Sequence, residues 1–157
     1  MSARTPRFTL LKLAKLAKVA HKVAYEARDR GVLHPDVLAP SDVLPLRTFD
    51  ALRRITWSGE RQARFEVQRL RLWESLAIEK SRMELAGLDP LTGLYVHPKG
   101  AELASRASDH AIHVLLLAEE GLPHHYLPLG SWAADALETL GQGEQVLFDR
   151  PSASDAA

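Results

Sequence analysis

The chain contains no cysteine among its 157 residues. This absence excludes a disulfide framework and any metal site built on thiolates, and it is typical of proteins of the reducing cytoplasm. Long apolar runs are also absent: the longest, AIHVLLLA, is far shorter than the roughly 20 residues of a membrane-spanning helix. Lysines interrupt the N-terminal apolar residues, so we expect no cleavable signal peptide. The sequence therefore predicts a cytoplasmic protein.

The C-terminal half of the chain has few basic residues, and the two halves carry opposite net charges. Residues 1–87 contain 17 Lys and Arg against 10 Asp and Glu, and residues 88–157 contain 3 against 10, although the net charge of the whole chain is zero. Such asymmetry indicates segments with different roles. We predict a basic helical segment at 1–87, a small acidic α+β half-domain at 88–149 and a disordered tail at 150–157.

The stretch KLAKLAK at residues 12–18 repeats lysine as helices designed to disrupt membranes do. On a helical wheel these lysines lie opposite an apolar stripe, with Thr9 and Gly31 suited to the start and end of the helix. The stripe is mostly alanine and valine, whose small side chains favour close helix packing over membrane binding. We predict a packed helix with solvated lysines; the alternatives are an anionic partner and, less favoured, a membrane surface. The candidate anion-binding residues are Lys12, Lys15, Lys18 and Lys22.

A longer helical pattern covers residues 58–86, after a proline-rich loop and a short predicted helix at about 41–55. The long pattern has two apolar faces, which is typical of a helix that packs on two neighbours or self-associates. Between the faces lies an arginine row that is either a Glu-paired solvated face or a phosphate-binding one. The row comprises Arg61, Arg64, Arg71 and Arg82, and the candidate self-association residues are Val67, Leu70, Trp73 and Ala77.

The acidic half alternates helical and strand patterns. We predict a helix at 99–110 that Pro98 can start, and a continuous apolar strand at 112–117 of the kind buried on both faces. A helix from Ser131 to Gly141 and a strand at 145–148 follow, with a third strand considered at 93–96. The expected fold class is α+β and mostly α, with N-terminal helices and a long two-faced helix leading into a small helix-strand-helix-strand layer. A sheet this small has exposed edges, so the long helix or a second subunit must cover it.

The stretch DPLTGLYVH at 89–97 resembles the DxLTGLxNR entry motif of the diguanylate cyclase (GGDEF) family. The resemblance covers about residues 75–141 and continues into LLLAEEGLPHHYLPLGSWAADALETL, which can be aligned without a gap to the family's next conserved pattern. The first metal-binding carboxylate then falls on Ala118, the second on Glu120, and the final aspartate on Asp135. The other aligned positions are Leu122, Tyr126, Gly130, Ser131 and Ala134.

The departures from the family decide what the resemblance implies for activity. The catalytic GG[DE]EF hairpin is absent from the sequence, and alanine replaces the first carboxylate. The family's chemistry needs divalent ions held by both carboxylates, so the resemblance implies a truncated, degenerate relative that does not cyclise GTP. Glu120 and Asp135 would then be relics of nucleotide and metal positions.

Other catalytic signals are weak. His110 and His113 are three residues apart, but in a stretch that passes into a strand they would point to opposite faces, so we predict no metal site. A G-x-S-x-G elbow is absent, as is a phosphate-binding loop. We therefore predict no enzyme activity and no cofactor.

The sequence favours a non-catalytic interaction or regulatory module, self-associating as a homodimer through its long helix. The rival prediction is a nucleic-acid-binding protein that uses the basic N-terminal helices. A residual nucleotide-binding enzyme is a third alternative, recognisable by a metal-dependent response to GTP.

Overall fold

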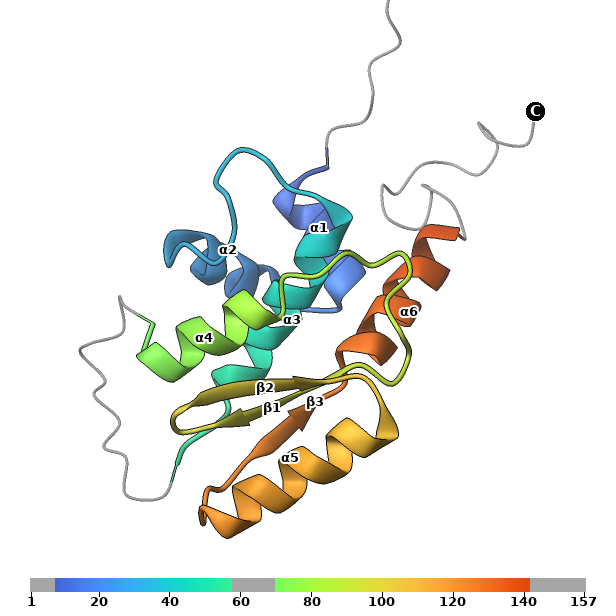
Figure 1. Ribbon diagram of the computed structural model, residues 1–157. Coiled ribbons are helices and arrows are strands. Elements are labelled where there is room, and N and C mark those ends of the chain that lie inside the picture. The colour runs from blue at the N-terminus through green and yellow to red at the C-terminus, as the bar shows by residue number, and fades with distance from the viewer. Residues whose placement is uncertain (1–7, 58–69, 142–157) are drawn as a thin grey trace, which may run out of the picture.

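The computed structural model describes residues 8–57 and 70–141, in which a small sheet lies between helices (Figure 1). The three antiparallel strands have the order β2-β1-β3, with α5 on one face and α3 and α4 toward the other. The predicted α+β, mostly α fold class is confirmed. In chain order the elements are α1 (Leu10–Ala17), α2 (His21–Asp29), the 3-10 helix η1 (Pro40–Asp42), α3 (Val43–Leu52), α4 (Leu72–Lys80), β1 (Gly93–His97), β2 (Gly100–Ala104), α5 (Ala107–Glu119), β3 (His125–Leu127) and α6 (Leu129–Gly141).

Helix α1 is the packed helix that the KLAKLAK pattern predicts. The Thr9 hydroxyl caps its start by accepting a hydrogen bond of 3.2 Å from the Lys12 backbone N–H. Leu13 and Leu16 on its apolar stripe are 0–1% exposed, so the stripe lies in the protein core. A membrane could bind this face only if α1 left the fold.

The helix predicted to run on to Gly31 instead ends at Ala17, so this prediction was wrong. Lys18 adopts the left-handed conformation, with a φ of 57°. The Val19 N–H then donates to the Ala14 carbonyl at 3.0 Å, which closes the helix in the manner of a Schellman motif. Burial of Val19 accompanies this turn, and α2 starts in a new direction.

The long helix predicted at 58–86 is also wrong over most of its described part outside α4. Leu70 and Arg71 precede the helix, with Arg71 in an extended conformation, and α4 runs only from Leu72 to Lys80. The buried Ser81 hydroxyl donates to the Ile78 carbonyl at 2.6 Å, which occupies an acceptor at the helix end. Residues 58–69 of the pattern lie outside the described residues. The short helix predicted near 41–55 is confirmed by α3.

The acidic half begins with a β-hairpin, and the helix predicted at 99–110 is wrong up to residue 106, since α5 begins only at Ala107. Strands β1 and β2 pair from Gly93–Ala104 to His97–Gly100, and Gly100 has a φ of +148° that favours glycine. The strand considered at 93–96 is confirmed as β1. The strand predicted at 112–117 is wrong, since these residues belong to α5. Helix α6 starts at Leu129, two residues before the predicted Ser131, and the strand predicted at 145–148 lies outside the described residues.

One hydrophobic core unites the two charge segments, with buried side chains from α1, α2, α3, α4, β1 and α6. Polar contacts join them as well. Asp135 of α6 pairs with Lys18 at 2.9 Å and with Arg47 of α3 at 3.3 Å, and the Arg47 guanidinium lies over the Trp132 ring. The boundary predicted near residue 87 therefore does not separate two cores in the described part of the chain.

Candidate functional site

The fold gives the four lysines that were predicted to bind an anion different environments. Lys15 and Lys22 are exposed on α1 and α2, while Lys12 is half-buried. Lys18 is exposed, but its ammonium pairs with Asp135. The four lysines therefore do not form one continuous surface reserved for an anion.

Arg71 and Arg82, the two arginines of the row that the structure describes, also make contacts within the chain. The Arg71 guanidinium pairs with Glu74 at 2.9 Å and lies over the Trp73 ring. The Arg82 guanidinium pairs with Glu79 and donates to the Val32 carbonyl, both at 3.0 Å. Of the two alternatives predicted for the arginine row, these contacts agree with pairing to glutamate for Arg71 and Arg82. Arg61 and Arg64 lie outside the described residues.

The predicted self-association residues do not form a free surface. Trp73 is 6% exposed and Ala77 is 0% exposed, because α4 packs them into the core of this same chain. Leu70 is half-buried against that core, and Val67 lies outside the described residues. Trp73 and Ala77 are therefore covered by this chain's own residues, and self-association through them stays a prediction.

The two candidate relic carboxylates occupy different environments. Glu120 is exposed at the C-terminal end of α5, whereas Asp135 holds Lys18 and Arg47. Burial lowers the pKa of Arg47, and the charge of Asp135 acts against this shift by favouring the guanidinium cation. In this fold Asp135 is a structural ion-pair residue.

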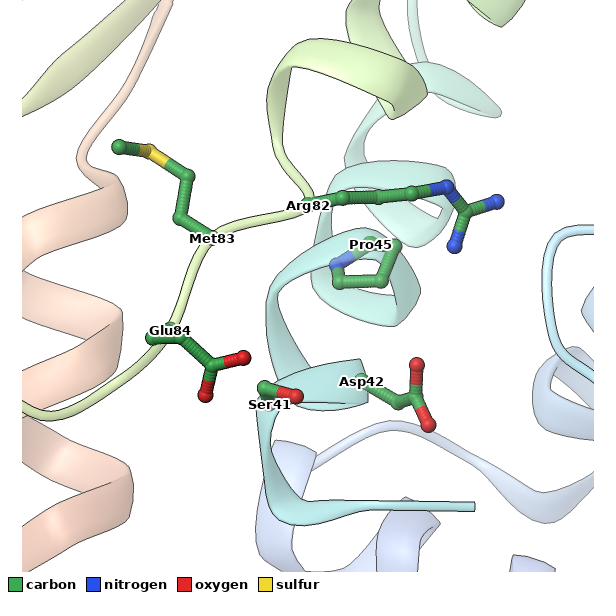
Figure 2. Close-up of a pocket in the computed structure, with 6 residues that line it drawn as sticks. All are labelled: Ser41, Asp42, Pro45, Arg82, Met83 and Glu84. Atoms are coloured by element: carbon green, nitrogen blue, oxygen red, sulfur yellow. The ribbon is translucent and has the colours of Figure 1, made fainter. Parts of the chain in front are cut away.

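A small pocket lies between η1, the start of α3 and the segment after α4 (Figure 2). Asp42 on its rim accepts a hydrogen bond from the Ala39 N–H at 2.8 Å, and Arg82 is paired as described above. Figure 2 shows Met83 directed away from Ser41 and the carboxylate of Glu84 directed toward it. The lining residues are Ser41, Asp42, Pro45, Arg82, Met83 and Glu84. Because its charged groups largely serve the local fold, this pocket does not carry the functional hypothesis.

The side of α5 that faces the sheet carries its histidines. His110 Nδ1 lies 2.7 Å from the Tyr95 hydroxyl, and His110 Nε2 lies 2.7 Å from the Leu91 carbonyl oxygen. Since a carbonyl can only accept, Nε2 donates to Leu91, and in the neutral ring Nδ1 accepts from Tyr95. His113 Nε2 likewise donates to the Leu103 carbonyl at 3.1 Å. The two imidazoles therefore fix α5 on the sheet.

His110 and His113 share a helix face, unlike the opposite strand faces predicted for them. Both rings lie beside Tyr95, and His124, in the connection between α5 and β3, lies beside the same tyrosine ring. Among the described residues, no group of three His, Asp or Glu side chains is placed to hold a metal ion. The cluster acts as a polar and aromatic layer between α5 and the sheet.

The outward side of α5 is apolar. Ile112 is 52% exposed, Leu115 is 63% exposed and Leu116 is 49% exposed, whereas Leu117 is the one residue of this helix that is fully buried. Ala111 and Ala118 are exposed beside them. The outer face of α5 is defined here as Ala111, Ile112, Leu115, Leu116 and Ala118. The helix therefore has the reverse of the usual arrangement, with histidines inside and leucines outside.

Sequence reasoning missed this surface because the run AIHVLLLA was interpreted as a buried strand. A signal was present: His110, His113 and Leu117 recur at helical spacing, and Ile112, Leu115 and Leu116 fall on the other side of such a helix. The interpretation took uniform apolarity as burial on both faces.

Tyr95 of β1 and Tyr126 of β3 are expected to make the stability of the fold depend on pH in the alkaline range. Burial raises the pKa of Tyr95, helped by the neighbouring Tyr126, and burial raises the pKa of Tyr126. In the unfolded chain both phenols ionise near their ordinary pKa of 10.0, so above it the unfolded state binds fewer protons than the folded state. We therefore expect the free energy of unfolding to fall as the pH rises past about 10.

Urea unfolding at about pH 9 and about pH 11 measures this loss. Tyr126→Phe should reduce the loss, because one of the two phenols is removed. The exposed Tyr25 provides the control, and Tyr25→Phe should leave the difference between the two pH values unchanged. An equal loss in wild type and Tyr126→Phe would contradict a role for Tyr126.

No family model, curated protein or solved structure matches this chain. The resemblance to the diguanylate cyclase family therefore stays a prediction. In the described parts of the chain, no helix combines the length and apolar character needed to cross a bilayer.

Proposed function

We propose that this chain is a non-catalytic interaction module and that its binding surface is the outer face of α5. The observation that carries the proposal is the orientation of this helix. Leu115 and its apolar neighbours point to solvent, while His110 and His113 hold the helix to the sheet through backbone carbonyls. Apolar side chains that gather on one rigid face are typical of a protein-binding site.

The energetics favour a covered face. Ile112, Leu115 and Leu116 are each about half exposed. Covering the exposed half of such a side chain contributes about 1 kcal/mol, given about 25 cal/mol per Å² of apolar area. The three together contribute several kcal/mol to a complex. Because the histidines already fix α5, little further ordering of the helix opposes binding.

The non-catalytic part of the proposal extends the sequence prediction, in which the resemblance to the diguanylate cyclase family puts Ala118 where that family has its first metal-binding carboxylate. The nucleic-acid alternative is less favoured, because Lys18, Arg71 and Arg82 serve contacts within the chain. Lys15 and Lys22 are the exposed cations left to that alternative among the described candidates.

Photo-crosslinking in cells that make the protein tests the proposed surface. A photoreactive phenylalanine analogue replaces Leu115 in one variant and Leu72 in a control, since Leu72 is 76% exposed on a different helix. We expect covalent adducts from position 115 and none from position 72. Adducts from neither position, with both variants folded, would overturn the assignment of the outer face of α5 as a binding surface.

A further inference from the structure

We propose that the partner on the outer face of α5 is a second copy of this chain, bound antiparallel through the same helix. This inference rests on the proposed function and names the occupant of the same surface. It is carried by the pattern of side chains along α5, which complements itself when the helix is reversed.

The first argument is charge. Arg106 precedes the first turn of α5, and Glu119 and Glu120 lie at its other end. Both placements oppose the helix dipole, which favours anions at the N-terminus and cations at the C-terminus. None of these three side chains makes an ion pair with another described residue, and all three residues are exposed. Asp109 is engaged locally, as its carboxylate accepts from the Arg106 N–H at 3.3 Å.

An antiparallel pair of α5 helices relieves both mismatches at once. Glu119 and Glu120 of each copy then approach the N-terminus and the guanidinium of Arg106 of the other copy. A parallel pair would instead bring four carboxylates together at one end, where like charges repel. The distribution of charge therefore selects the antiparallel orientation.

The second argument is shape. If the two-fold axis passes between Ile112 and Leu115, each Ile112 meets the Leu115 of the other copy. Each Leu116 then faces the other copy's Ala111, so a large side chain meets a small one. Glu119 faces the other copy's Ser108, next to the N-terminus of that helix. Such a pairing is isologous, as a symmetric dimer requires.

One helix of this length gives a smaller interface than a typical stable dimer. We therefore expect a reversible dimer with a dissociation constant on the order of micromolar. Sedimentation velocity over a dilution series measures it directly. Wild type should pass from monomer to dimer as the concentration rises.

Two variants locate the interface. Leu115→Glu should remain monomeric over the same series, because it places a charge at the centre of the pair. Leu115 is exposed in the single chain, so circular dichroism should show an unchanged fold. Leu72→Glu changes an equally large exposed side chain on α4 and should leave the dissociation constant unchanged.

A charge exchange tests the orientation. Arg106→Glu and Glu119→Arg should each weaken association about 10-fold or more, and the double variant should restore it to within a few-fold of wild type. Arg106→Glu suits the dipole of its own helix, so weaker association cannot be attributed to a weaker fold. Failure of the double variant to rescue would overturn the antiparallel pairing.

The failures are distinguishable. A wild-type chain that stays monomeric, while the crosslinker at position 115 traps a different protein, overturns the second-copy inference and leaves the proposed function intact. A monomeric chain without adducts at position 115 overturns both. A dimer that Leu115→Glu leaves unchanged also overturns the inference, because the contact then lies elsewhere.

Discussion

Replacing Gly130 with alanine is expected to lower the free energy of unfolding by about 3 kcal/mol, near the upper end of the usual cost of overpacking. Gly130 lies in the first turn of α6, and its N–H donates to the Thr92 carbonyl at 2.8 Å. An added Cβ would meet the backbone of Asp89 and Pro90, reaching the Pro90 carbonyl oxygen at 2.6 Å. Because these neighbours are backbone atoms, they cannot rotate away.

Two other glycines serve as matched controls in urea or thermal unfolding. At Gly141 the Cβ would meet nothing within 4 Å, so Gly141→Ala should be neutral or slightly stabilising at this helix end. At Gly93 the Cβ would meet the side chain of Tyr126, which is 44% exposed and has room to turn outward. We expect a smaller loss there. Equal stability of Gly130→Ala and wild type would show that α6 does not approach the 89–92 turn as closely as described.

Asp135→Asn is expected to lower the free energy of unfolding by about 1–2 kcal/mol, a value between those of exposed pairs and of hydrogen-bonded charges. The Lys18 side chain is 61% exposed and contributes little of this. The Arg47 side chain is 22% exposed, and burial already lowers its pKa, so it depends more on the Asp135 carboxylate. The substitution keeps the shape of the side chain and removes its charge.

Glu138 of the same helix provides the control, because it is exposed and has no ion pair among the described residues. Glu138→Gln should change stability by less than about 0.5 kcal/mol. Salt should narrow the gap between wild type and Asp135→Asn by screening the more exposed Lys18 pair first. A wild-type stability that Asp135→Asn leaves intact would contradict the role of Asp135 in joining α6 to α1 and α3.

Helices were predicted best from the sequence where the same pattern of residues indicated both the local structure and the buried face. The periodicity of KLAKLAK and the cap at Thr9 agree, and α1 follows them. The end of α1 was not predictable from propensity, since Lys18 occupies a left-handed position that usually falls to glycine and costs about 1–2 kcal/mol in other residues. Packing of Val19 against the core and the closing hydrogen bonds offset that cost.

The sequence contains residues typical of a turn between β1 and β2, but the hairpin was not predicted from them. Pro98 and Lys99 separate two five-residue strands, and Gly100 supplies the positive φ that follows them. Interpreting Pro98 as the start of a helix placed residues 99–106 in the wrong element, whereas residues 107–110 do lie in a helix, α5.

The candidate surface could not be predicted because its sequence departs from the rule that burial follows apolarity. The leucines of α5 have high helix propensity, yet their run resembles a strand buried on both faces. Such a conflict between an apolar sequence and an exposed position is expected at a binding surface, because the single chain lacks the partner residues that would cover it. The histidines face the sheet because backbone carbonyls and Tyr95 satisfy their ring nitrogens there.

The orientation of α5 is the claim on which the surface depends, and nuclear Overhauser contacts to the Tyr95 ring measure it most directly. The structure places the rings of His110 and His113 within 5.5 and 6.4 Å of that ring, centroid to centroid. We therefore expect cross-peaks from both imidazoles to Tyr95 and none from the Ile112 or Leu115 methyl groups. Strong cross-peaks from those methyl groups would mean that α5 is rotated with its apolar side inward, and no outer binding face would remain.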